Sequence, residues 1–315
     1  MTSTPTISAG ACSIVRPTTI IESSRLNQSL GARIIIASET FQETGSFKLR
    51  AAYRVACSVP HHLLITASSG NFGQALAYSC ALIGKSSIVV MPSTAAQVKI
   101  DAVREYGAQV ELIDTRSISR KERVAAIAAA NPDAYVASSS DDPLVIAGNS
   151  SLGRELSAFA GWFDLIVAPI GGGGLTSGLI AGLERAGAKI PVLAAEPLLA
   201  NDAAQSLREG RIVTLPGEPA TIADGARVLS VGRHNWPLLR GGLAGVIEVP
   251  EDAIAKAVAL LFAEATLKVE PTGALAVAAV LSHPEKFERK TVCCVVSGGN
   301  VDPTTYARLI GHTVN

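Results

Sequence analysis

Short runs of Val, Ile and Leu recur along this 315-residue chain, separated by longer Ala-rich segments. Several runs are continuously apolar, which is typical of strands covered on both faces of a parallel sheet. Strands and helices in alternation predict an α/β fold with parallel-rich sheets flanked by helices. We expect strands at residues 32–37, 62–67, 86–91, 108–113, 134–137, 165–170, 191–195, 245–249 and 292–297, and helices at 47–57, 72–83, 96–106, 120–130, 175–186, 252–266 and 273–281.

Composition narrows the functional classes. Lys plus Arg and Asp plus Glu both number 27, so the net charge is zero, which argues against a dedicated nucleic-acid binder. No apolar run reaches the roughly 18 residues that span a bilayer. The five cysteines form no Cys-x-x-Cys, and MTSTPTISAG lacks the pattern of a secretory signal. We therefore expect a cytoplasmic protein without nucleic-acid or membrane partners.

Lys48 stands just inside an expected helix start, behind Gly45 and Ser46. The positive end of a helix dipole disfavours the ammonium form, and a lowered pKa suits an amine that acts as nucleophile or base. Taken alone, the segment favours an exposed lysine of the first turn.

Two further segments offer backbone N–H groups to an anion. Ser68, Ser69, Gly70 and Asn71 follow an apolar strand and open a helix, where a substrate carboxylate is well held; an ordinary capped turn explains them equally well. The consecutive glycines 171–174 follow another buried strand, where their entropic cost makes sense if the backbone wraps closely around a phosphate. Their spacing matches neither the dinucleotide fingerprint nor the P-loop.

Two polar segments are weaker signals. Ser297 ends a strand before two glycines and offers one hydrogen bond to a ligand, although a tight turn accounts for it too. Glu196, the Ala200 carbonyl and Asp202 are hard oxygen ligands for Mg²⁺ or Ca²⁺, but their spacing alone favours a solvated loop.

Together, and in this order, these segments resemble the threonine dehydratase and serine racemase family, which belongs to the fold type II pyridoxal-phosphate enzymes. The resemblance runs from about Pro17 to Asp302 and includes Glu-Pro-Thr-Gly at 270–273 and Ser-Gly-Gly-Asn at 297–300. It implies two domains, a large cofactor-binding domain of residues 1–58 and 146–315 and a small inserted domain of residues 59–145. It also implies a homodimer.

The resemblance implies a role for each motif. Lys48 is similar to the Schiff-base lysine, and Asn71 and Ser297 to the partners of the cofactor's ring hydroxyl and ring nitrogen. The implied cofactor site is Phe47, Lys48, Asn71, Gly171, Gly172, Gly173, Gly174, Leu175 and Ser297; the implied substrate clasp is Ser68, Ser69, Gly70 and Asn71; the implied site for Mg²⁺, Mn²⁺ or Ca²⁺ is Glu196, Ala200 and Asp202.

The implied activity is dehydration of a β-hydroxy amino acid of the L-threonine or L-serine type to a 2-keto acid and ammonia. Lys48 would take the Cα proton, and the neutral Ser297 hydroxyl at the ring nitrogen would favour loss of the β-hydroxyl. The alternatives are racemisation, with Ser69 as second catalytic base, β-replacement, and cofactor binding without catalysis, against which an intact Lys48 argues.

Substrate choice has two further signals. Arg120, Arg227, Arg233 and His234 are candidates to bind a distal carboxylate, which would favour threo-3-hydroxyaspartate, although solvated surface residues are the better explanation for each. The family usually has Gly-Gln-Gly-Thr where this chain has Gly-Asn-Ser-Ser at 148–151, so the pocket and domain hinge are expected to differ there.

Overall fold

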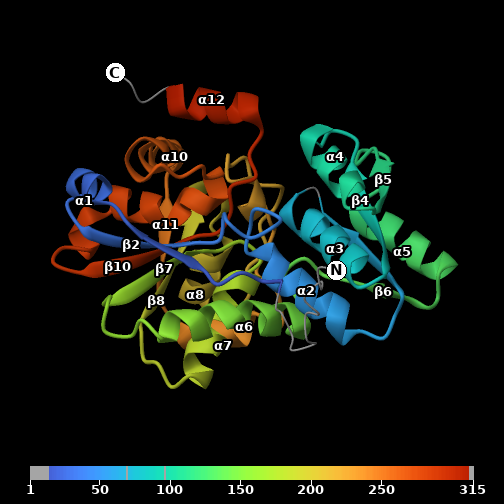
Figure 1. Ribbon diagram of the computed structural model, residues 1–315, viewed down its shortest axis with the longest axis horizontal. Helices are drawn as coiled ribbons and strands as arrows, with labels where there is room; N and C mark the ends of the chain where they lie inside the picture. Colours follow the sequence, from blue (N-terminus) through green and yellow to red (C-terminus); the bar gives the residue numbers. More distant parts are fainter. Residues whose placement is uncertain (1–13, 69, 96, 312–315) are drawn as a thin grey trace, which may run out of the picture.

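The computed structural model describes residues 14–68, 70–95 and 97–311; Ser69 lies outside them. Its strands form two sheets (Figure 1), as the sequence predicts. The larger sheet has the order β1-β2-β10-β7-β8-β9 and is parallel except for the edge pair β1–β2. Its strands are β1 (Thr19–Glu22), β2 (Arg33–Ser38), β7 (Leu165–Pro169), β8 (Val192–Pro197), β9 (Leu243–Val249) and β10 (Thr291–Val296).

The smaller sheet is parallel throughout and has the order β5-β4-β3-β6. Its strands are β3 (Leu63–Ala67), β4 (Ser86–Pro92), β5 (Gln109–Ile113) and β6 (Ala134–Val136). All of them fall inside residues 59–145, whereas the larger sheet takes strands from both sides of that segment. This arrangement agrees with a small inserted domain, whose boundaries stay a prediction.

Helices cover the sheets. Around the larger sheet and the junction they are α1 (Ser24–Leu30), α2 (Lys48–Ser58), α6 (Pro143–Ser157), α7 (Gly174–Arg185), α8 (Asp202–Glu209), α9 (Trp236–Gly242), α10 (Glu251–Ala265), α11 (Pro271–Ser282) and α12 (Pro303–Gly311); around the smaller sheet they are α3 (Asn71–Leu82), α4 (Gln97–Glu105) and α5 (Arg120–Ala130). In Figure 1, α2 lies between the two groups. No helix in the described part of the chain is long and apolar enough to cross a membrane.

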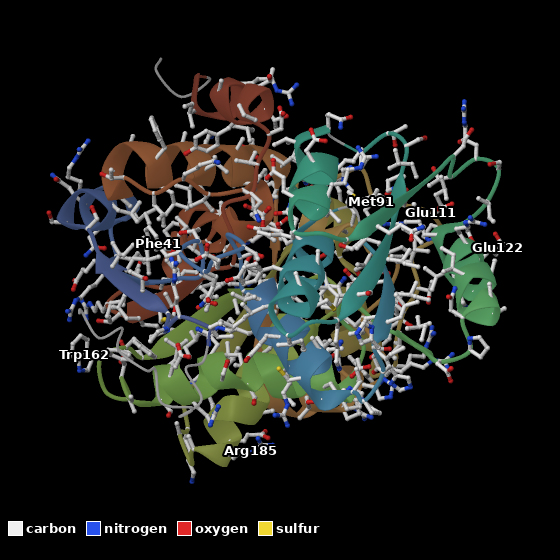
Figure 2. All side chains as sticks on the ribbon, turned by 45° about the vertical axis from the view of Figure 1, so that its right-hand side comes forward. Phe41, Met91, Glu111, Glu122, Trp162 and Arg185 are labelled. Carbon is white, nitrogen blue, oxygen red and sulfur yellow. The ribbon has the colours of Figure 1, made fainter. Side chains whose placement is uncertain are left out.

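The larger sheet carries a separate apolar core on each face. Because side chains alternate along a strand, Cys294 and Val296 of β10 pack with α10 and α11, whereas Cys293 and Val295 pack with α7. All four are fully buried, which explains the continuously apolar runs. Away from these cores, Trp162 is 58% exposed and lies at the margin of the molecule (Figure 2).

Glycines bring α6 against both α2 and α7. A Cβ at Gly148 would lie 2.5 Å from the Arg50 carbonyl oxygen, and one at Gly153 would lie 2.2 Å from the Leu179 carbonyl oxygen. The backbones therefore approach too closely for any side chain at these positions. The helix as a whole was not expected from the sequence, because its glycines and serines lower helix propensity.

A network of ion pairs around the buried Arg50 holds the first turn of α2 in place. The Arg50 side chain has no exposed surface; its Nε lies 2.7 Å from Glu39 Oε2, and its Nη1 lies 2.6 Å from Glu155 Oε1. Burial alone would lower the pKa of Arg50, but the two carboxylates outweigh it and raise that pKa above its ordinary value. Arg50 thus ties α2 to the end of β2 and to α6, two residues after Lys48.

Candidate active site

A cavity of about 720 Å³ lies between the parts of the chain that carry the two sheets. It is lined by Lys48 at the start of α2, by the segment that opens α3, and by the glycine run that opens α7. The fold therefore brings together segments that lie far apart in the sequence. The sequence-predicted residues that line it are Phe47, Lys48, Ser68, Gly70, Asn71, Gly171, Gly172, Gly173, Gly174, Leu175 and Ser297.

Lys48 has the properties of a reactive amine. Its Nζ donates a hydrogen bond to the Ser139 carbonyl oxygen at 2.6 Å and lies 5.0 Å from the centre of the Phe47 ring. Burial lowers the pKa of Lys48 to about 8, against a smaller opposing effect of the Glu270 charge. The direction of this shift is the one that the sequence argument expects, and burial is its main cause.

Lys48 is positioned through β10. The Phe47 backbone N–H donates to the Ser297 carbonyl oxygen at 3.0 Å, so the start of α2 is attached to the end of β10. Ser297 is only 1% exposed, and it lines the same cavity as Lys48. One backbone hydrogen bond thus brings the amine and this hydroxyl to one wall of the cavity.

The run Gly171 to Gly174, here called the glycine loop, presents free backbone donors. Within the described residues, none of its four N–H groups has a protein acceptor. Gly173 has φ +93°, and a Cβ at Gly174 would lie 2.7 Å from the Ser140 carbonyl oxygen. Unpaired N–H groups at the start of a helix are what a phosphate group requires.

The segment that opens α3 is held by its own side chains and by residues near β10. Ser68 Oγ accepts from the Gly73 N–H at 3.0 Å, so this hydroxyl pairs with one N–H of the first turn of α3. Asn71 Nδ2 donates to Glu270 Oε1 at 2.7 Å, and Asn71 Oδ1 accepts from Asn300 Nδ2 at 2.9 Å. The N–H groups of Asn71 and Phe72 have no acceptor within the described residues, so they are available to an anionic ligand.

Glu270 is a cavity residue to which the sequence assigned no role beyond its motif. It lines the cavity and is 3% exposed. Burial, helped by the nearby Asp224 charge, raises the pKa of Glu270 to about 8. Asp224 itself pairs with Lys99 of α4 at 2.5 Å, so an ion pair between the two parts of the chain lies at this wall of the cavity.

The four basic residues that the sequence offers as partners of a distal substrate carboxylate fall into two groups in the structure. Arg120 and Arg227 line the cavity, together with Lys121, which the sequence did not single out. Arg233 and His234 are not among the described residues that line it: their backbone N–H groups donate to Asp141, at 3.0 and 2.8 Å. The expectation for Arg233 and His234 therefore finds no support in the cavity.

The predicted cation ligands Glu196 and Asp202 lie close together outside the cavity lining, each 1% exposed. Glu196 accepts from the backbone N–H groups of Ala203 and Ala204, at 3.1 and 2.6 Å. Asp202 Oδ2 is buried and has no hydrogen-bond partner among the described residues. Two adjacent buried carboxyls with a free oxygen fit a divalent cation, although no cluster of three or more His, Cys, Asp or Glu side chains suited to a metal occurs in the described chain.

Comparisons with known proteins agree with this geometry. Residues 12–298 match the family described as "Pyridoxal-phosphate dependent enzyme". The chain is 37% identical to human serine racemase over 91% of this chain and 87% of that protein. It is 32% identical to an L-threo-3-hydroxyaspartate ammonia-lyase of Pseudomonas sp, over 93% of this chain and 92% of the relative.

A solved structure of a threonine deaminase, whose source is abbreviated T.th., superposes with a TM-score of 0.86 at 38% identity, covering 91% of this chain and 94% of that one. The predicted fold type II architecture is therefore confirmed. The family match spans most of the chain, and one cavity contains both the buried Lys48 and the glycine loop. This chain therefore belongs to the pyridoxal-phosphate-dependent enzyme family.

Proposed function

We propose that this protein is a dehydratase that converts a β-hydroxy amino acid into a 2-keto acid and ammonia. The observation that carries the proposal is the Lys48 amine, whose pKa burial lowers to about 8, in one cavity with the unpaired N–H groups of the glycine loop. The similarity to ammonia-lyases over nine-tenths of the chain supports the same reaction class.

The cavity residues fit pyridoxal phosphate. The glycine loop would bind the phosphate, because its N–H groups lie at the positive end of α7 and have no acceptor among the described residues. Lys48 would hold the aldehyde carbon covalently, Ser297 would contact the ring nitrogen, and Asn71 would contact the ring hydroxyl. The bound cofactor would supply the electron withdrawal that acidifies the Cα proton of an amino acid.

The chain's own groups supply the remaining chemistry. The N–H groups of Asn71 and Phe72, which have no acceptor among the described residues, would hold the substrate carboxylate at the start of α3. Lys48 Nζ, partly neutral near pH 8, would take the Cα proton. Ser297 offers a neutral hydroxyl rather than a carboxylate, so negative charge at Cα is best relieved by departure of the β-hydroxyl. Hydrolysis of the unsaturated amine then consumes a water and releases the keto acid and ammonia.

A substrate panel tests the reaction. Keto-acid release is measured from L-serine, D-serine, L-threonine and L-threo-3-hydroxyaspartate with protein saturated with pyridoxal phosphate. We expect release from at least one of the L-substrates, and its loss in Lys48→Ala. Protein that holds the cofactor but releases no keto acid from any of the four would refute the dehydratase proposal.

A second candidate function is dehydration of a substrate that carries an additional carboxylate distant from Cα. Arg120, Lys121 and Arg227 line the cavity without an ion-pair partner among the described side chains. Arg227 Nε donates to the Thr221 carbonyl oxygen at 2.7 Å, which fixes its guanidinium. Unpaired cations in a partly buried cavity favour an anionic substituent, so threo-3-hydroxyaspartate is the dicarboxylic substrate that this pocket suits.

A matched pair of variants tests the distal-carboxylate candidate. Arg227→Gln removes a cavity cation, whereas Arg233→Gln removes an arginine that does not line the cavity. We expect the first to lower the preference for 3-hydroxyaspartate over serine by about tenfold, the value of one charge-assisted hydrogen bond of about 1.4 kcal/mol. The second should leave it unchanged; equal preferences in both variants and the native protein would exclude Arg227 from substrate recognition.

Racemisation stays the alternative reaction. It requires a second proton donor at Cα, and the resemblance assigns that role to Ser69, which lies outside the described residues. Formation of D-serine from L-serine, measured by chiral chromatography, would support it. We expect Ser69→Ala to lower racemisation more than keto-acid release if Ser69 acts in this way.

We also propose a divalent cation at Glu196, the Ala200 carbonyl and Asp202. The support is the pair of adjacent buried carboxyls and the unpartnered Asp202 Oδ2, since a cation would remove the cost of burying two like charges. Mg²⁺, Mn²⁺ or Ca²⁺ should raise the melting temperature of the native protein. The same ions should leave Glu196→Gln unaffected, and no stabilisation of the native protein would count against the site.

We also propose that this protein is a cytoplasmic homodimer. It rests on the family resemblance and on the free cysteines at positions 57, 80, 293 and 294. Light scattering on a size-exclusion column should give twice the chain mass of 32.5 kDa; a mass equal to that of one chain would contradict the dimer.

A further inference from the structure

Two buried asparagines from different parts of the chain donate to the glycine loop. Asn149 of α6 donates from Nδ2 to the Gly174 carbonyl oxygen at 3.0 Å, and Asn235 donates from Nδ2 to the Gly172 carbonyl oxygen at 2.7 Å. Neither asparagine has any exposed surface. The sequence marked Asn149 only as part of the unusual segment 148–151, where the pocket and hinge were expected to differ, and it did not mark Asn235.

The orientation of both amides is settled by their neighbours. The Oδ1 atoms of Asn149 and Asn235 are buried without a hydrogen-bond partner among the described residues. Turning either amide over would set its oxygen against a carbonyl oxygen, which is worse than leaving it unpaired. An unpaired buried oxygen is costly, of order 1–3 kcal/mol. Each asparagine therefore donates from its Nδ2 atom, while its Oδ1 atom stays unpaired among the described residues.

Anchoring these carbonyls orients the N–H groups of the loop. A trans peptide unit is planar, so its N–H points away from its C=O. The Gly172 carbonyl shares a peptide unit with the Gly173 N–H, and the Gly174 carbonyl shares one with the Leu175 N–H. Gly173 and Leu175 both line the cavity. Holding the carbonyls toward Asn149 and Asn235 turns these two N–H groups away from the asparagines.

Glycines need such an anchor more than other residues do. Gly171, Gly172 and Gly173 precede α7 and have no side chains that restrict their backbone, so hydrogen bonds from outside the loop help to fix their peptide groups. The Gly172 carbonyl has a second donor, the Gly232 N–H at 3.0 Å, and Asn235 Nδ2 also reaches the Ser140 carbonyl oxygen at 3.1 Å. The segment that contains Ser140 also accepts the Lys48 hydrogen bond, at Ser139.

We propose that Asn149 and Asn235 are positioning residues that pre-orient the glycine loop for the phosphate of the cofactor, by holding its carbonyl groups away from the cavity. The inference rests on the proposed role of this loop as the phosphate site. It assigns phosphate affinity, rather than the reactivity of Lys48, to the two side chains.

Pyridoxal, which has the aldehyde but no phosphate, separates the two effects. Cofactor-free protein is titrated with pyridoxal phosphate and, separately, with pyridoxal, and the visible absorbance of the bound aldehyde gives each Kd. For Asn149→Ala and for Asn235→Ala, we expect the Kd for pyridoxal phosphate to rise about tenfold, equivalent to about 1.4 kcal/mol. The Kd for pyridoxal should stay within about twofold of the native value, since neither asparagine is hydrogen-bonded to the Lys48 amine.

Asn131→Ala is the matched control. Asn131 Nδ2 also donates to a backbone carbonyl oxygen, that of Ile127 at 2.8 Å, but Asn131 does not line the cavity. We expect both Kd values to be unchanged in this variant. If an alanine variant does not fold, as judged by circular dichroism, the serine variant replaces it with the same expected ratio, because the shorter hydroxyl does not reach the carbonyl.

The outcomes distinguish this inference from the proposed function. An unchanged Kd for pyridoxal phosphate in both variants, or an equal loss of affinity for both aldehydes, would overturn the positioning role while leaving the function intact. A native protein that binds neither aldehyde would overturn the proposed function itself.

Discussion

Arg50→Met is the perturbation whose cost is best defined by the structure. The Arg50 and Glu39 side chains have no exposed surface, and Glu155, the second partner, is 30% exposed. Methionine roughly fills the space of the arginine stem but leaves Glu39 without its cation in a site that water does not reach. Removing one partner of a buried ion pair costs about 3–5 kcal/mol, so we expect the free energy of unfolding to fall by that amount.

Urea denaturation followed by circular dichroism measures this change. The double variant Arg50→Met with Glu39→Gln should recover at least about 1 kcal/mol, because a neutral amide is cheaper to bury than a lone carboxylate. Arg116→Ala is the control. Arg116 forms an ion pair with Asp114, but its side chain is 89% exposed, so the free energy of unfolding should fall by less than about 0.5 kcal/mol. A loss under about 1 kcal/mol for Arg50→Met, or no recovery in the double variant, would show that burial of an unpaired Glu39 carboxylate is not costly here.

Three further predictions concern packing and titration. Gly153→Ala should destabilise the protein by about 1–3 kcal/mol in urea denaturation, because its Cβ would lie 2.2 Å from a backbone oxygen, whereas Gly241→Ala, with open space around it, should not. The rate at which cofactor-free protein combines with pyridoxal phosphate should rise with pH and level off above about 8, since only neutral Lys48 reacts; a rise that continues toward 10.5 would contradict the lowered pKa. Burial raises the pKa of Glu270 from 4.5 to about 8, so between these values the folded protein holds a proton that the unfolded chain has released. The melting temperature of cofactor-free protein should therefore fall as pH rises through this window, and Glu270→Gln should reduce that slope; equal slopes would refute the assignment.

The local motifs meet in one cavity because each one lies where a strand meets a helix. Lys48, Asn71 and Ser297 belong to segments that end or follow parallel strands, and parallel strands bring such ends to one edge. The continuously apolar runs likewise predicted the strands of both sheets. Only the short edge strand β1 (Thr19–Glu22) was missed within the described residues, since four residues carry little periodicity.

Contacts between segments that lie far apart in the chain could not be predicted from the sequence. The sequence marked the segment 148–151 as unusual, but only the fold shows that Asn149 and Asn235 donate to the glycine loop. The α6 helix had a start signal, Asp142 as cap followed by Pro143, but its glycines argued against a helix. Those glycines are explained only by the close approach of α2 and α7, since tertiary packing overrides local propensity there.

Borohydride reduction shows which lysine carries the cofactor. Protein saturated with pyridoxal phosphate is reduced with borohydride, which fixes the cofactor to the lysine that holds it, and is then digested and mapped by mass spectrometry. We predict that the modified peptide contains Lys48 and that Lys48→Arg yields no modified peptide. Attachment to a different lysine, or no attachment in protein that is folded and saturated, would contradict the account.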